Sequence, residues 1–148
     1  MNTKHTKIMV MKKLQNSKYF SVNEMLHSDK AERLKIDNTP KSDEIVDNIQ
    51  YLMGRLDEIR DGYGKPIYIN SAYRCPKLNE AVGGVSSSYH QMGLAADLRY
   101  DSELKDYIIK NCQFGRLIEE RSKSAIWIHI QFKRNRNEET NKVIYMTV

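Results

Sequence analysis

Apolar residues recur every three or four positions between residues 45 and 59, which is the spacing of one face of an α-helix. Thr39 can cap a helix, Pro40 suits a first helical position, and Gly62 and Gly64 are residues that end helices. The sequence therefore predicts a long amphipathic helix from Pro40 to these glycines, with one face buried against another element. The apolar positions are Ile45, Ile49, Leu52, Leu56 and Ile59.

Residues 126–132 (IWIHIQF) alternate in a way typical of a half-buried strand, with Trp127, His129 and Gln131 on one face. Shorter strand patterns cover residues 66–70 and 94–100, and a short helix is expected after Ser102 as its cap. Because helices and non-adjacent strands mix in this order, we expect an α+β domain in which a small, mainly antiparallel sheet packs against helices.

A chain of 148 residues suffices for one domain with its own core. Residues 1–18 are polar and basic, so we expect a flexible N-terminus, followed by a single domain over residues 19–148. No apolar run near the start is long enough for a transmembrane helix or for a secretory signal. We therefore expect neither membrane insertion nor a visible signal peptide.

The net charge is +5, which favours polyanionic partners such as nucleic acid, anionic lipid or cell-wall polymers. The positive residues are scattered, apart from Lys133, Arg134 and Arg136, and neither an RNA-binding signature nor zinc-finger spacing is present. We expect no nucleic-acid partner. Cys75 and Cys112 form no CxxC motif and are expected to be ordinary thiols, so a bound zinc must use other ligands.

Three residues offer donors suited to a metal ion. His90 closes a Gly-, Ser- and Asn-rich stretch, residues 71–92, that is expected to be a long loop with one helical turn. Asp97 lies seven residues later and His129 another 32 residues on, each on a predicted strand. Two imidazoles and one carboxylate suit Zn²⁺ and leave one position open, as in catalytic sites. A single histidine in a strand is more often a packing or surface group, so the surrounding pattern decides.

The string at residues 88–97 is SYHQMGLAAD, of the form S-x-H-x-x-G-x-A-x-D. It resembles the signature of the zinc peptidase family that contains D-alanyl-D-alanine carboxypeptidases and phage L-alanyl-D-glutamate endopeptidases. Residues 71–84 resemble the family's S-G-Y-R-x-x-x-L-N…G-G segment, with Ala72 in place of a glycine, and residues 127–130 (WIHI) resemble its W-x-H-x strand. The opening segment of small single-domain members is also matched, and the resemblance covers roughly residues 19–137. The matching residues there are Phe20, Ser21, Glu24, Ser28, Ala31 and residues 36–40 (IDNTP).

This resemblance implies that His90, Asp97 and His129 hold one Zn²⁺ per chain in a cleft. It also assigns Arg74 to substrate binding, since a guanidinium can bind a stem-peptide carboxylate with two parallel hydrogen bonds. The alternative is a structural arginine paired with a local acid. Trp127 either borders the substrate cleft or packs beside it. The expected substrate-binding residues are Arg74, Ser88 and Trp127.

The general acid/base is less clearly marked. Many relatives carry an acidic residue three positions before the last histidine, where this chain has Ile126, which cannot transfer a proton. The segment FGRLIEE resembles an F-D-Q-L-I-x-E segment of small members, although Gly115 and Arg116 depart from it, and places Glu120 at the acidic position. Glu119 is the reserve candidate, and the alternative is that both glutamates are ordinary solvated residues.

We therefore expect a monomeric zinc metallopeptidase that hydrolyses peptide bonds in peptidoglycan stem peptides, as an endopeptidase or a D-Ala carboxypeptidase. Without a visible signal peptide, the resemblance favours a phage or prophage lysin that stays cytoplasmic until a partner holin releases it to the cell wall. The alternative is a catalytically inactive peptidoglycan-binding module that keeps the fold, an interpretation left open by Ile126.

Overall fold

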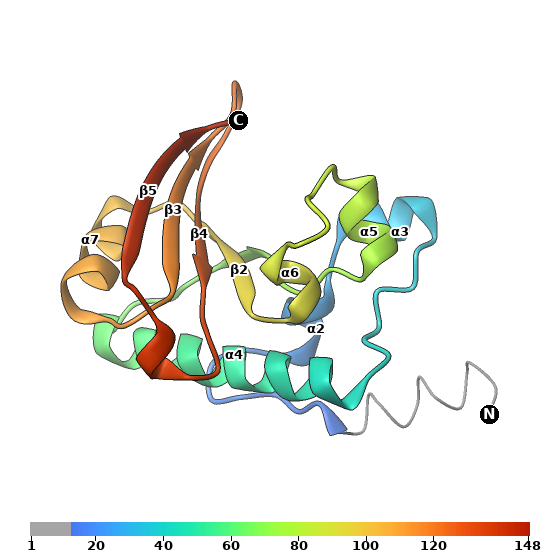
Figure 1. Cartoon of the computed structure of the whole chain (residues 1–148), viewed down its shortest axis with the longest axis horizontal. Coiled ribbons are helices and arrows are strands. Elements are labelled where there is room, and N and C mark those ends of the chain that lie inside the picture. Colours follow the sequence, from blue (N-terminus) through green and yellow to red (C-terminus); the bar gives the residue numbers. More distant parts are fainter. Residues whose placement is uncertain (1–12) are drawn as a thin grey trace.

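The computed structural model describes residues 13–148, and most of the predicted basic terminus, residues 1–12, lies outside them. Its centre is a five-stranded sheet with the strand order β1-β2-β4-β3-β5 (Figure 1). Neighbouring strands are antiparallel except for β3 and β5, which are parallel. The prediction of an α+β domain with a mainly antiparallel sheet is confirmed. The strands are β1 (Ile69–Ser71), β2 (Ala95–Arg99), β3 (Arg116–Arg121), β4 (Ile126–Gln131) and β5 (Lys142–Thr147).

The long predicted helix is α4 (Asp43–Tyr63), which crosses one side of the sheet (Figure 1). Ser42 caps it by accepting a hydrogen bond from the Ile45 N–H, and Gly64 ends it with a φ of 78°. The predicted start at Thr39 and Pro40 is wrong by three residues, and Gly62 lies inside the helix. The reason is tertiary: the side chain of Asn38 binds the backbone of residues 26, 73 and 75, so this turn belongs to the packing of the domain.

The apolar stripe of α4 forms the core together with the buried face of the sheet. Ile49, Leu52 and Leu56 are fully buried, whereas Ile45 is only partly buried at the edge of the core. Each fully buried side chain of this size contributes about 1.5–3 kcal/mol. Helix α7 (Ser102–Asn111) packs on the same side, and its cap is Asp101 rather than the predicted Ser102. The sheet side chains in the core are Leu98, Leu117, Ile128 and Ile130.

Shorter helices surround this core. The stretch predicted as a long loop with one helical turn, around residues 77–82, contains that turn as α5 (Pro76–Ala81) and a second short helix, α6 (Tyr89–Met92). Strand β1 is shorter than the predicted strand. Leu14 is buried in the core although it lies within residues 1–18, which were predicted to be a flexible N-terminus. Among residues 13–148, no helix combines the length and the hydrophobicity needed to cross a bilayer. The remaining helices are α2 (Val22–Leu26), α3 (Asp29–Leu34) and the 3-10 turn η1 (Arg136–Glu138).

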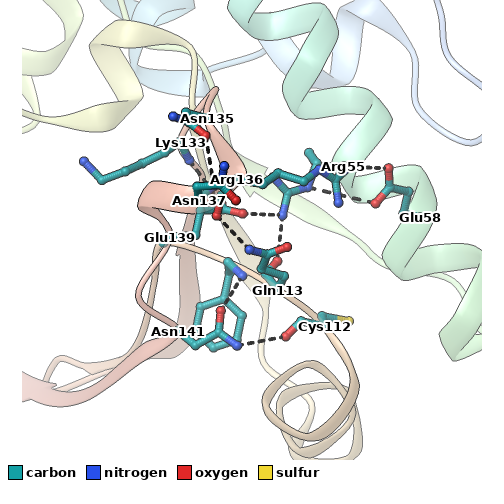
Figure 2. Close-up of polar contacts among 12 residues, drawn as sticks. Arg55, Glu58, Cys112, Gln113, Lys133, Asn135, Arg136, Asn137, Glu139 and Asn141 are labelled. Carbon is teal, nitrogen blue, oxygen red and sulfur yellow. Dashed lines mark hydrogen bonds and ion pairs between the residues drawn. The ribbon is translucent and has the colours of Figure 1, made fainter.

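A buried ion pair fixes the connection between β4 and β5 to helix α4. Arg55 donates to Glu139 Oε1 at 2.8 Å and to the Gln113 carbonyl at 2.8 Å (Figure 2). The Glu139 side chain is fully buried, and its second oxygen accepts the Lys133 N–H at 3.1 Å. Removing Arg55 would leave the Glu139 carboxylate buried and unpaired, and removing Glu139 would leave Arg55 only its longer contact with Glu58 at 4.0 Å, so this pair stabilises the position of the connection.

Candidate active site

The face of the sheet opposite α4 carries polar side chains in three rows that run across the strands. Residues paired in register point to the same side of a sheet, so each row lies on one face. Asp97 faces His129 across β2 and β4, and His129 faces Ile118 across β4 and β3. We name the rows by their chemistry. The metal row is Asp97, His129, Ile118 and Ile144; the acid row is Arg99, Trp127, Glu120 and Met146; the basic row is Ala95, Gln131, Arg116 and Lys142.

The three predicted ligands converge at one point. Asp97 Oδ1 lies 3.2 Å from His90 Nε2 and 3.1 Å from His129 Nδ1. One donor atom from each residue falls within 4.8 Å of the others. His90 reaches the sheet from α6, where the Ser88 hydroxyl caps the helix by accepting the His90 N–H. Both histidines are buried and Asp97 is partly buried, and all three residues line one cleft.

The hydrogen bonds of His90 leave a lone pair directed into this cluster. Its Nδ1 lies 2.7 Å from the Ala72 carbonyl, which can only accept, so the ring proton belongs on Nδ1. The neutral ring then directs the lone pair of Nε2 at Asp97 Oδ1, which is also an acceptor. Two acceptors this close are stabilised by a cation between them. The arrangement is that of a metal ligand whose tautomer is fixed by a second hydrogen bond.

Zn²⁺ fits this donor set. Ligand atoms around a tetrahedral zinc ion at 2.0–2.1 Å lie about 3.3 Å apart, close to both separations from Asp97 Oδ1. Burial alone raises the pKa of Asp97, but positive charge at the two imidazoles lowers it far below its usual range. With neutral imidazoles, a bound metal cation would supply that positive charge and keep the carboxylate ionised. The other nitrogen of His129, Nε2, lies 2.8 Å from Gln131 Oε1, so this ligand also has a supporting contact.

The two candidate glutamates point to opposite sides of β3. Glu120 pairs with Trp127 in the acid row and lines the same cleft as the three ligands. Burial and the charge of Asp97 raise the pKa of Glu120, against the opposing effects of His129 and Arg74. Glu119 faces α7, where its Oε1 accepts from Lys105 Nζ at 2.9 Å and from the Tyr100 hydroxyl at 3.1 Å. Only Glu120 is therefore within the site.

Arg74 and Trp127 border the cleft, which has a volume of about 900 Å³ and is also lined by Ser88. Arg74 follows β1, and its backbone N–H donates to the His90 carbonyl at 3.1 Å. The Arg74 Nε is buried and has no hydrogen-bond partner within residues 13–148. The Trp127 Nε1 is also buried and forms no hydrogen bond of good geometry there, although Trp127 lies close enough to Glu120 to favour its ionised form. Arg74 forms no ion pair with an acidic residue among residues 13–148, although the charges of Asp97 and Glu120 act on its guanidinium. Its predicted role as a carboxylate clamp stays a prediction.

Sequence reasoning did not identify the groups that orient the ligands. Gln131 shares a strand face with His129, and this two-residue spacing was the available signal for its contact with His129 Nε2. The Ala72 carbonyl that fixes His90 is a backbone atom and has no signature in the sequence. Lys133 and Met146 also line the cleft, from a segment for which no function was predicted.

Two imidazoles and a partly buried carboxylate, with a glutamate in the same cleft, are the kinds of group found in the site of a metal-dependent hydrolase. A family model described as Peptidase M15 matches residues 18–131, which is most of the chain. The chain belongs to the peptidase M15 family, whose members are zinc-dependent peptidases. This match confirms the predicted membership in a zinc peptidase family. A comparison with curated proteins gave no match.

Proposed function

We propose that this protein is a zinc-dependent peptidase that hydrolyses peptide bonds in the stem peptides of bacterial peptidoglycan. The observation that supports it most is the convergence of His90, Asp97 and His129, because their lone pairs meet where a cation would balance them. Glu120 and Arg74 lie in the same cleft and add a proton acceptor and a carboxylate clamp. An inactive binding module would have no use for this combination.

Each polar group has a defined part in the proposed reaction. Bound zinc would lower the pKa of water and polarise the scissile carbonyl as a Lewis acid. Glu120 accepts a proton from the attacking water and donates it to the leaving nitrogen, for which its raised pKa suits it. Arg74 binds a substrate carboxylate with two parallel hydrogen bonds and so fixes the peptide in the cleft.

The extent of the cleft favours an endopeptidase over a carboxypeptidase. Its lining runs from Arg116 and Gln131 on one side of the ligands to Met146 and Val148 on the other, so peptide can extend in both directions. A carboxypeptidase needs room on one side for a single residue only. Together with the family resemblance, the cleft leads us to propose an endopeptidase of phage or prophage lysin type that acts at the cell wall.

Zinc analysis combined with a peptidoglycan digest tests the proposal. The purified protein should contain about one zinc per chain. Incubation with purified sacculi should release fragments with new amino and carboxyl termini, and mass spectrometry of these termini identifies the bond. An endopeptidase leaves new termini within the stem, whereas a carboxypeptidase releases only D-alanine. Binding to sacculi without new termini would mean that the chain is an inactive wall-binding module.

A further inference from the structure

We propose that Arg116 and Lys133 form a second carboxylate-binding subsite, on the side of the metal ligands away from Glu120. This inference rests on the proposed function and specifies its substrate: a stem peptide that carries a free carboxylate on the residue lying toward the basic row. Burial lowers the pKa of Arg74 against the opposing charges of Asp97 and Glu120. Arg74 therefore lies near these two acids, in a different part of the cleft from the basic row.

The register of the sheet determines where this subsite lies. Arg116 is directly opposite Gln131, and this pair lies two residues along the strands from the pair of Ile118 and His129. Two residues of a strand span about 7 Å. A substrate in extended conformation repeats at the same spacing, so a side chain near the scissile bond can reach Arg116. Both Arg116 and Lys133 line the cleft that contains the ligands.

Lys133 is held in position by three separate contacts. Its N–H donates to Glu139 Oε2 at 3.1 Å, and its carbonyl accepts from the Tyr51 hydroxyl at 3.0 Å. Figure 2 shows its side chain extending away from the buried Arg55. The ammonium group then donates to the Tyr89 hydroxyl, 3.1 Å away on α6. A cation fixed at both ends loses little entropy when it binds an anion, which favours a binding role over a solvated surface charge.

Neither cation is neutralised by an acidic residue of the described chain. Arg116 forms no ion pair within residues 13–148, and Lys133 Nζ contacts a phenol rather than a carboxylate. Two acidic residues lie nearby. Glu139 is paired with Arg55, and the charge of Glu138 raises the pKa of Lys133 without an ion pair between the two side chains. Two positive groups that repel each other within one cleft are stabilised by an anion between them, and a carboxylate accepts from both.

Synthetic stem tetrapeptides test the subsite, with each free carboxylate replaced in turn by a carboxamide. For one of these replacements, the parent protein should lose about tenfold in kcat/KM, mainly through KM, as expected for loss of a charged hydrogen bond. Each of the variants Arg116→Gln and Lys133→Gln should have a lower kcat/KM on the peptide with this carboxylate free. Each should also cleave that peptide and its carboxamide analogue equally well. Arg116→Lys should keep part of the preference because it keeps the charge.

Lys110→Gln is the matched control, since it removes the same charge from α7 on the opposite side of the sheet and should behave like the parent. Thermal unfolding of each variant checks that the fold is kept. If the parent cuts no peptide, the proposed catalytic function fails, and calorimetric titration of the same peptides into the zinc-loaded protein tests the subsite separately. Equal response of the parent to every acid and amide pair, or unchanged preference in both glutamine variants, would overturn the subsite.

Discussion

Glu120 and Trp127 lie directly opposite each other in the β3–β4 pair, and both side chains point to the side of the sheet that carries His129. Glu119, one residue earlier, points to the other side and binds Lys105 of α7. A carboxylate at the metal site and a carboxylate that fastens a helix to the sheet are thus neighbours in sequence. Replacing each by glutamine separates the two roles.

Glu120→Gln should retain zinc while turnover falls by about 10²-fold or more, because glutamine keeps the shape of the side chain but accepts no proton. Glu119→Gln should retain the turnover of the parent, since its side chain faces α7. Initial rates on muropeptides, with zinc content measured on the same samples, provide the comparison. Full turnover in Glu120→Gln would exclude it as the general acid/base.

The ion pair of Glu119 should make stability depend on pH. The hydrogen bond from Lys105 lowers the pKa of Glu119 despite partial desolvation, so its contribution is present above the unfolded-state pKa and is lost as pH falls through the folded-state pKa. Glu119→Gln should therefore cost about 1 kcal/mol at neutral pH. The difference from the parent should shrink below about pH 4. Urea unfolding at several pH values measures it, and Glu103→Gln, which removes an exposed ion pair, should cost less.

Removal of any one ligand should remove the metal. His90→Ala, Asp97→Ala and His129→Ala should each bind far less than one zinc per chain, because two remaining donors form an incomplete site. His27→Ala is the control, since the His27 ring pairs with the exposed Asp29 and Glu32. Chelation should lower the unfolding temperature of the parent but not that of the ligand variants, because only a metal-binding native state gains stability from zinc. Full zinc occupancy in His129→Ala would contradict the assignment.

Arg74→Lys should impair catalysis without changing the fold or the zinc content. Lysine cannot reproduce the two parallel hydrogen bonds of a guanidinium to a carboxylate. The expected loss in kcat/KM is roughly 10- to 150-fold, corresponding to about 1.5–3 kcal/mol. Arg99→Lys is the matched control: Arg99 stacks on Tyr68 at 4.1 Å and does not line the cleft. Equal rates for Arg74→Lys and the parent would remove Arg74 from substrate binding.

Arg55→Met should destabilise the protein by about 3–5 kcal/mol, because it leaves the buried Glu139 carboxylate without a partner. Glu139→Gln should cost less, since the amide oxygen still accepts from Arg55. The double variant Arg55→Met/Glu139→Gln should lose less than the sum of the two, as expected for residues in contact. Urea unfolding measures all three. A cost in Arg55→Met comparable to that of an exposed ion pair would show that the pair does not fix the β4–β5 connection.

The elements that the sequence predicted correctly are those with a clear apolar pattern of their own. Helix α4 followed from its apolar periodicity, and β4 followed from its alternation. Strand β5 was not predicted, because only Val143 packs against the core and its pairing with β3 is parallel and distant in sequence. The start of α4 was placed too early, since the sequence does not show that Asn38 is engaged by residues 26, 73 and 75.

The ligands were predicted from a motif, whereas their environment was not. His90 and Asp97 belong to one short string, but the distance between Asp97 and His129 depends on the pairing of β2 with β4. The choice between Glu120 and Glu119 depended on a register that the sequence leaves open by one residue, and the β3–β4 pairing places Glu120 at the cleft. Its role in proton transfer stays a prediction.

The segment between Arg74 and His90 leaves the sheet and returns to it, and its two ends are joined by hydrogen bonds. At its base, the Arg74 N–H binds the His90 carbonyl, and His90 Nδ1 binds the Ala72 carbonyl. The tip carries Val82 and Val85, which are exposed at the rim of the cleft. Lengthening a surface loop costs little closure entropy. Insertions in this segment can therefore change which peptides are accepted without moving the three ligands. It is the site at which we would engineer a new substrate selectivity.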